Sequence, residues 1–116
     1  MAADRRSSLL KGVLDLLVLS RLTDGESYGY EIAKALAEAG LGEIKGGTLY
    51  PVLNRLEQAG LVEAEFRATE RGPGRRYYRL TADGRDHLAA ESRDWLRFHD
   101  TVRTLLSPLS PGGTRP

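Results

Sequence analysis

The spacing of apolar residues changes once along the chain, at Gly60, and this change constrains the fold more than any other feature. The segment Gly46–Val62 first repeats apolar side chains three and four positions apart, the spacing of one helix face. These apolar positions are Leu49, Val52, Leu53 and Leu56. From Val62 onward apolar and charged residues alternate, the spacing of a strand with one buried face. The sequence therefore predicts a helix followed directly by a strand.

The predicted helix has signals for both of its ends. Thr48 is a suitable N-cap, which would place Pro51 at the third helical position, where no backbone N–H is needed. Gly60 supplies a stop just past the end. The face opposite the leucines carries Tyr50, Pro51, Asn54, Arg55 and Gln58. A helix with one apolar side and these groups on the other is typical of an element that rests on a core and faces a partner.

Two more helices are expected before this one. Residues 9–22 are apolar nearly all round, which indicates burial against the domain's own core and also against a second subunit. Leu10 and Leu14 are the residues of this helix that we expect at the subunit interface. Ser27 is the expected N-cap of the next helix, residues 28–39. The inward-facing residues of that helix are predicted to be Ile32, Ala33, Leu36 and Ala37.

A second strand, residues 75–80, follows the first strand after a turn rich in glycine and proline at residues 68–74. Tyr78 and Leu80 share one face of it. Between residues 67 and 79 the chain carries five arginines and one acid, although its overall net charge is only +1. Three helices followed by a basic hairpin predict a mainly α fold, a winged helix-turn-helix with a three-helix core and a two-stranded wing, over residues 9–80.

A long C-terminal helix, residues 81–106, is expected to form a dimer. Thr81 is its predicted cap, and one stripe of the helix carries large apolar residues at coiled-coil spacing. These residues are Leu88, Trp95, Phe98, Val102 and Leu105. A symmetry mate would bury this stripe, and the alternative is that the helix folds back on its own wing. Residues 1–8 are expected to be flexible, and residues 107–116, rich in Pro, Gly and Ser, to be disordered.

Composition excludes several other classes of protein. The 116 residues suit one domain, and the absence of cysteine rules out disulfides and thiolate metal sites. His87 and His99 are too far apart to share a helix turn, so we expect no metal and no cofactor. The longest apolar run is too short and too polar to cross a membrane, and no signal sequence precedes it. We therefore expect a cytoplasmic protein without a membrane partner.

Three segments carry a resemblance to a known family: YGYEI at 28–32, GTLYPVLNRLEQAGLV at 47–62 and RRYYRLTADGRDHL at 75–88. With them the chain resembles the PadR family of transcriptional regulators over residues 9–106, in the branch with a short C-terminal region. The resemblance implies a homodimer that binds a pseudo-palindromic operator in double-stranded DNA. Known members are usually repressors that a small molecule releases.

The residues predicted to bind DNA fall into two groups. The first, on the recognition helix, comprises Lys45, Thr48, Tyr50, Pro51, Asn54 and Arg55. Asn54 suits an adenine edge, Tyr50 a phosphate or a thymine methyl group, and Lys45 and Arg55 suit phosphates. Alternatively, Tyr50 and Pro51 only shape the start of the helix. The second group, on the wing, comprises Arg71, Arg75, Arg76 and Tyr77. These would follow the DNA backbone or probe the minor groove, and the alternative is an ordinary solvated hairpin.

Trp95 is the candidate contact for a small aromatic effector, and plain hydrophobic packing at the dimer interface is the alternative. An enzyme is not expected, because the chain lacks a phosphate-cradling glycine loop, a cysteine nucleophile and a close His–carboxylate set. The remaining rival is a winged-helix module that binds protein without recognising a DNA sequence.

Overall fold

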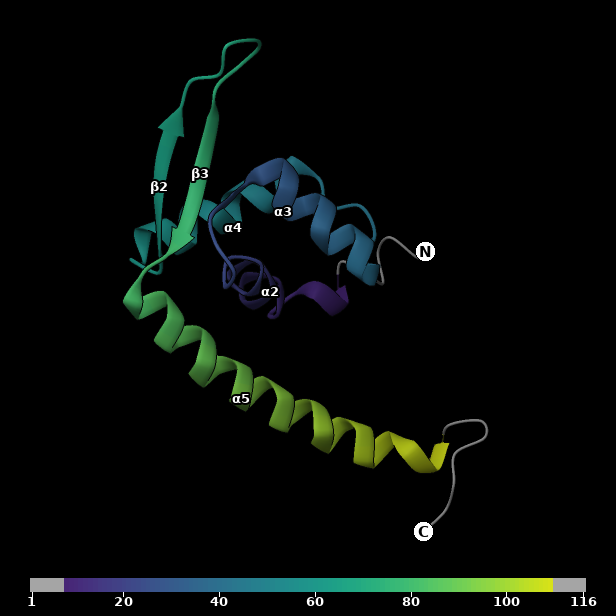
Figure 1. The fold of residues 1–116 in the computed structure, drawn as a ribbon. Coiled ribbons are helices and arrows are strands. Elements are labelled where there is room, and N and C mark those ends of the chain that lie inside the picture. Colours follow the sequence, from purple (N-terminus) through teal and green to yellow (C-terminus); the bar gives the residue numbers. More distant parts are fainter. Residues whose placement is uncertain (1–7, 110–116) are drawn as a thin grey trace.

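The computed structural model describes residues 8–109, in which three helices and a small sheet surround one core, and a long helix leads away from it (Figure 1). The helices are α2 (Leu14–Ser20), α3 (Gly29–Leu36), α4 (Gly46–Gln58) and α5 (Ala82–Leu106). The strands are β1 (Ser27–Tyr28), β2 (Val62–Arg67) and β3 (Arg75–Leu80). A π-helical turn, Ala37–Leu41, follows α3, and a 3₁₀ turn, Ser107–Leu109, continues α5.

The core gathers apolar residues from all three helices and from the inner face of the sheet. All four apolar residues predicted for α4 are buried, so the expected orientation of this helix is confirmed. The least exposed large side chains are Tyr78, Leu19, Leu22, Ile32, Leu49, Leu53, Val18 and Val62. Since α4 is anchored by its leucine face, its other face is left for solvent or a partner.

The sheet has three strands in the order β1-β3-β2, both pairs antiparallel. The hairpin of β2 and β3 matches the prediction residue for residue, with Val62 opposite Leu80 and Arg67 opposite Arg75. β1 was not predicted. Its two residues pair with Tyr78 and Tyr77 of β3, and a strand this short has no periodicity that a sequence pattern can reveal.

Two expectations about the helices before α4 are wrong. The first helix is not continuous over residues 9–22, because Gly12 has φ 88° and separates residues 8–10 from α2. Ser27 is not an N-cap, because it lies in β1, and Tyr28 is the residue that precedes α3. The Ser27 hydroxyl donates to Glu31 Oε1 at 2.9 Å instead.

The predicted start of α4 is also wrong, by three residues. α4 begins at Gly46 with Lys45 in the capping position, and the Lys45 carbonyl accepts N–H bonds from Thr48 and Leu49, both at 2.9 Å. Thr48 is therefore the third helical residue, and Pro51 the sixth. Pro51 has no N–H to donate to the carbonyl of Gly47, so the helix tolerates one missing bond near its exposed N-terminal end.

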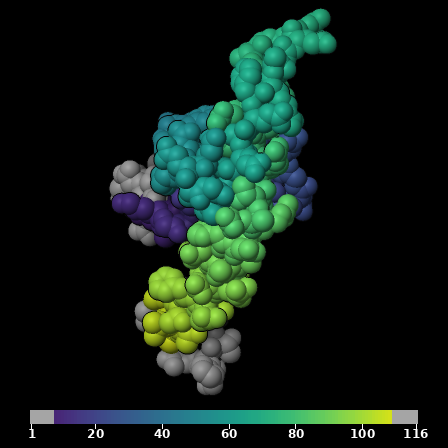
Figure 2. Space-filling model, turned by 90° about the vertical axis from the view of Figure 1, so that its left-hand side faces the viewer, coloured from purple at the N-terminus to yellow at the C-terminus, as the bar shows by residue number. Residues whose placement is uncertain are grey.

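α5 begins as predicted. The Thr81 side chain accepts a hydrogen bond from the Gly84 N–H at 2.9 Å and donates to the Gly60 carbonyl at 2.7 Å, which ties the start of α5 to the end of α4. Beyond this anchor the helix projects from the body on the side away from the wing tip (Figures 1 and 2). Gly84 is the one α5 residue that is fully buried.

Some sequence expectations concern parts that the structure does not describe. Residues 1–7 of the expected flexible N-terminus and residues 110–116 of the expected disordered tail lie outside the described residues. Within the described range, none of the helices combines the length and the apolar character that crossing a membrane requires.

Candidate nucleic-acid interface

The exposed face of α4 carries the predicted recognition residues together. Thr48, Tyr50, Pro51, Asn54 and Arg55 are all exposed, and so is Lys45 just before the helix. At 100° per residue, the positions farthest from the buried leucines are Gly47, Pro51, Asn54 and Gln58. Gly47 and Gln58 are not among the predicted contacts, although Gln58 is on the predicted polar face.

Tyr50 leans toward α3 rather than straight outward. A methyl group added at Gly29 would lie only 2.5 Å from the Tyr50 hydroxyl oxygen, and one added at Gly46 would lie 3.3 Å from the ring. The ring is about half exposed, at 48%. Tyr50 therefore packs its hydroxyl end on the start of α3, which supports the alternative that it shapes the domain while part of the ring stays accessible.

Arg55 is held by α2. Its Nη2 donates to Asp15 Oδ1 at 2.7 Å and its Nε to Asp15 Oδ2 at 3.3 Å, a two-bond pair across 40 residues of sequence. The hydrogen bonds and the charge of Asp15 raise the pKa of Arg55. The side chain is thus directed to one edge of α4, where it also lines a groove with Lys45 and Thr48.

The predicted wing site is divided between the two faces of the hairpin. Arg76 and Tyr78 lie on the face toward α4, whereas Arg75 and Tyr77 lie on the opposite face, because successive residues of a strand alternate. The residues predicted for the wing therefore lie on two different faces of the hairpin. Arg71 lies apart from all three, exposed in the loop at the wing tip.

On the α4 side, Arg76 pairs with Glu57. Its Nη2 lies 2.9 Å and 2.7 Å from the two carboxylate oxygens, and its guanidinium is 5.9 Å from the Tyr78 ring centroid. Hydrogen bonding to Glu57 raises the pKa of Arg76. This pair ties the wing to the C-terminal half of α4.

The outer face of the hairpin carries a stack in which two tyrosine rings meet at a tilt and one arginine lies over each ring. Arg75 lies 4.4 Å from the Tyr28 ring centroid, Tyr28 lies 5.3 Å from Tyr77, and Arg67 lies 4.4 Å from Tyr77. Arg67 also pairs with Glu26 at 2.7 Å. The stack joins β1 to the hairpin, so Arg75 and Tyr77 have an evident structural task there.

Phe66 is a prominent wing residue that the sequence analysis did not single out. It lies opposite Arg76 in the hairpin and is 64% exposed, because the wing extends beyond the core at this point. A side chain at Gly74 would collide with its ring, so Phe66 covers the backbone at the base of the tip loop. The alternation of apolar and charged residues in β2 predicted that Phe66 faces inward, but it could not show that the core ends before this residue.

The predicted dimer residues differ in their exposure to solvent in the single protomer. Leu14 belongs to the protomer's own core, with 7% exposed, so its assignment to a subunit interface is wrong. Phe98 and Leu105 are 64% and 70% exposed, while Leu10, Leu88, Trp95 and Val102 are half-buried. Leu96 and Leu106, which the sequence analysis omitted, are also exposed at 58% and 54%.

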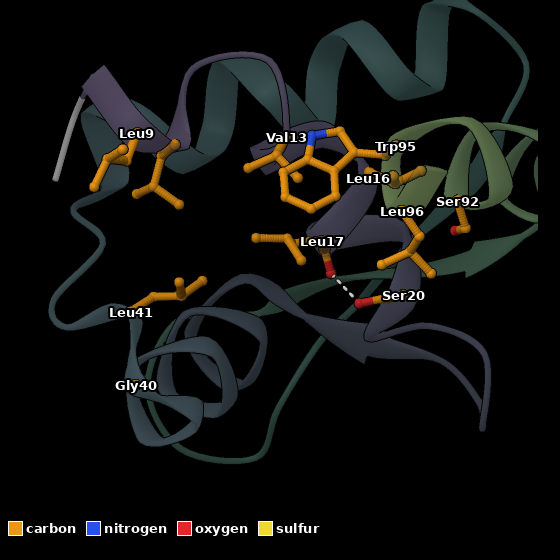
Figure 3. A pocket seen from close by; sticks show the side chains of 11 residues that line it. Leu9, Val13, Leu16, Leu17, Ser20, Gly40, Leu41, Ser92, Trp95 and Leu96 are labelled. Carbon is orange, nitrogen blue, oxygen red and sulfur yellow. Dashed lines mark hydrogen bonds between the residues drawn. The ribbon is translucent and has the colours of Figure 1, made fainter. Parts of the chain in front are cut away.

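An apolar groove lies between α2 and the middle of α5, with a volume of about 730 Å³ (Figure 3). The residues that line it are Leu9, Leu10, Val13, Leu16, Leu17, Ser20, Gly40, Leu41, Ser92, Trp95 and Leu96. Figure 3 shows the Trp95 indole standing beside Val13 and Leu16. The Ser20 hydroxyl donates to the Leu17 carbonyl at 2.6 Å, so it is already satisfied. On its other side Trp95 stacks with His99, 5.5 Å between centroids.

The described residues contain no group of three or more His, Asp or Glu side chains placed to hold a metal ion. His99 lies 3.7 Å from its neighbour Asp100, and this pair stands alone on the surface of α5.

Comparison with known proteins places this geometry in a wider group. The sequence model described as the transcriptional regulator PadR-like family matches residues 18–90. The transcriptional regulator Rv3488 of Mycobacterium tuberculosis is 36% identical over 83 residues, which cover 72% of this chain and 76% of that protein. A PadR family transcriptional regulator from Eggerthella lenta has a similar structure, with a TM-score of 0.79, 36% identity and coverage of 90% of this chain and 91% of the other. A PadR-like regulator from Bacillus cereus gives a TM-score of 0.74 at 34% identity, covering 85% and 96%.

Proposed function

The chain belongs to the PadR-like family of transcriptional regulators, and from this premise we propose that it is a homodimeric repressor of a pseudo-palindromic operator. Members of the family are transcriptional regulators and not enzymes. The observation that carries the proposal is the exposed face of α4, which is anchored on buried leucines and flanked by the basic wing. A regulator of this kind acts on the chromosome, in keeping with the expected cytoplasmic location.

In the proposed complex the exposed face of α4 enters the major groove. Asn54 is on the outermost stripe of the helix, where its amide can donate to and accept from an adenine edge. Lys45 and Thr48 lie at the N-terminal end, where short contacts to phosphates would fix the register. Pro51 would pack on the groove wall, and Tyr50 would contribute its exposed edge while its hydroxyl end supports α3.

The wing would lie along the DNA backbone beside α4. Arg71 at the tip and Arg76 on the α4 side are the proposed phosphate contacts, because both are exposed. We assign Arg75 and Tyr77 a supporting role, since both belong to the stack on the outer face. This division refines the predicted wing site without adding a residue to it.

The dimer is proposed to form through α5. Its exposed apolar residues, Phe98, Leu105 and Leu106, extend beyond the protomer's own core, and a second copy would remove them from water. Two α4 helices related by such a two-fold axis would meet half-sites about 10 base pairs apart, or a multiple of that.

The effector is proposed to be a planar aromatic molecule that enters the groove beside Trp95. The groove has a volume of about 730 Å³, within the range of small-molecule sites, roughly 300–1,000 Å³. Its lining is mostly apolar, as is usual for such sites. A panel of planar aromatic compounds is titrated into the protein while Trp95 fluorescence is followed. The pH is held constant, because His99 stacks on the Trp95 ring. Quenching that saturates supports the assignment. If no compound of a broad panel changes the emission, the effector proposal fails.

One observation favours a second candidate function, a winged-helix module that binds protein. Arg55 and Arg76 are both paired with carboxylates, which lowers the free positive charge of the surface. Fluorescence anisotropy with a labelled random duplex at low salt separates the two functions. A DNA-binding regulator binds the duplex and loses affinity steeply as salt rises, whereas a protein-binding module shows no binding at any salt concentration.

The role of α4 is tested in the same assay with Asn54→Ala, using Gln58→Ala near the C-terminal end of the same stripe as the matched control. Asn54→Ala is expected to reduce discrimination between operator and scrambled duplex by about 5–100-fold, the range for one bidentate base contact. Equal losses of affinity for both duplexes would show that Asn54 only positions the helix.

A further inference from the structure

Two of the arginines assigned to DNA are already bound by carboxylates in the protein alone. Arg55 and Asp15 make two hydrogen bonds, and Arg76 places one nitrogen on both oxygens of Glu57. The two carboxylates come from different elements, Asp15 from α2 and Glu57 from α4 itself. A DNA phosphate that binds either arginine must therefore replace a carboxylate or share the guanidinium with it.

These pairs are suited to exchange. The side chains of Arg55 and Asp15 are 59% and 46% exposed, and those of Arg76 and Glu57 are 48% and 33% exposed. Ion pairs this open to water are held weakly and are screened by salt. A phosphate offers the same fork geometry to a guanidinium as a carboxylate does. The exchange is thus chemically possible, but it returns less free energy than binding an unpaired arginine would.

We propose that Asp15 and Glu57 limit the affinity for DNA, because they compete with DNA phosphates for Arg55 and Arg76. The proposal rests on the proposed function in DNA binding. Attraction to phosphate is the same on every sequence, so the competition lowers affinity for random DNA. At an operator the base contacts of α4 add to this same phosphate attraction, so the competition lowers the overall affinity, whereas the base contacts set the ratio of operator to random affinity.

The position of Asp15 makes it the stronger of the two competitors. It lines a groove of about 630 Å³ between the start of α2 and the start of α4, together with Lys11, Lys45 and Arg55. Without Asp15, these three cations would face the groove opposed by Glu43 alone among its lining residues. Neutralising Asp15 would therefore create a basic strip next to the N-terminal end of α4, where the DNA is proposed to lie.

A matched control is available on the outer face of the hairpin. Glu63 accepts a hydrogen bond from Arg79 at 2.8 Å, and both side chains are more than half exposed. Glu63→Gln changes the net charge by the same amount as Asp15→Asn or Glu57→Gln, but its partner Arg79 faces away from α4 and also lies 3.9 Å from Glu65. A difference between these variants thus reports position and not total charge.

The test measures affinity for a random duplex and for a duplex recovered by selection, over a series of salt concentrations. Asp15→Asn is expected to bind the random duplex about 3–10-fold more tightly at low salt, with the slope of log K against log salt steeper by about 0.9, the value for one added phosphate contact. The selected duplex is expected to gain by a similar factor, because the added phosphate contact is the same on both duplexes. Glu57→Gln shifts in the same direction, and Glu63→Gln matches the wild type.

Thermal unfolding first establishes that each variant is folded, which is expected because all three carboxylates are at the surface. The inference is overturned if Asp15→Asn leaves the random-duplex affinity unchanged, weakens it, or strengthens it no more than Glu63→Gln does. If the wild type binds no duplex at low salt, the proposed function itself fails, so the two failures are distinguishable.

Discussion

The packing of Tyr50 on Gly29 links two sequence motifs that lie far apart in the chain, and it can be tested by Gly29→Ala. The new methyl group would lie 2.5, 2.8 and 2.9 Å from Oη, Cζ and Cε1 of Tyr50. Ordinary contacts between carbon atoms are about 3.5–4.0 Å, so the ring must move by close to 1 Å. Gly29 is buried, whereas the Tyr50 ring is about half exposed and can yield outward.

The expected cost follows from these contacts. Inserting a methyl group into a packed site costs about 1–3 kcal/mol, and the better helix propensity of alanine returns up to about 1 kcal/mol. A net loss of about 1–2 kcal/mol is therefore expected for Gly29→Ala. For a domain of this size each 1 kcal/mol lowers Tm by about 4–8 °C.

A double-mutant cycle with Tyr50→Ala isolates the contact. Urea and thermal unfolding are measured for Gly29→Ala, Tyr50→Ala and the double variant at one protein concentration, because a dimer would make Tm depend on concentration. In the Tyr50→Ala background, Gly29→Ala is expected to be neutral or stabilising. Gly47→Ala is the matched control, since a methyl group there meets nothing within 4 Å. An equal loss from Gly29→Ala in both backgrounds would refute the packing assigned to Tyr50.

Three further predictions concern α5 and its surroundings. Gly84→Ala would direct a methyl group into the Leu61 carbonyl oxygen, a backbone atom that cannot move aside as a side chain can. We expect the free energy of unfolding to fall by about 3 kcal/mol or more in urea titrations. A loss below about 1 kcal/mol would contradict this contact. Thr81→Val keeps the shape of the side chain but loses both of its hydrogen bonds, so the free energy of unfolding is expected to fall by about 1–2 kcal/mol in urea titrations. An unchanged urea midpoint would show that the cap is dispensable. Phe98→Glu is expected to shift the protein from dimer to monomer in analytical ultracentrifugation while far-ultraviolet circular dichroism stays unchanged; a persistent dimer would remove this residue from the interface.

Local signals in the sequence were sufficient for the elements that carry the proposed site. The leucine spacing of α4 predicted its buried face because the four residues lie on one side of a single helix. The alternation after Gly60 predicted the hairpin with its bounds, and Thr81 predicted the start of α5. Each of these signals is contained within a few neighbouring residues, so no knowledge of the rest of the chain is needed.

The features that could not be predicted depend on residues far apart in the chain. β1 exists only because β3 lies beside it, and Tyr50 turns toward α3 only because Gly29 leaves room. The Arg55–Asp15 pair joins residues 40 positions apart, so a list of exposed cations counts Arg55 as free. Sequence patterns thus predicted which residues share the exposed face of α4 but missed the contacts that these residues make with the rest of the protein.

The central claim is that two α4 helices of a dimer recognise DNA sequence together. Selection of bound duplexes from a random library with the purified protein tests it most directly. The account predicts enrichment of an inverted repeat whose half-sites are centred about 10 base pairs apart, or a multiple of that, with Asn54→Ala relaxing the preference at one symmetric pair of positions. Recovery of no enriched sequence, or of a single site without two-fold symmetry, would contradict it.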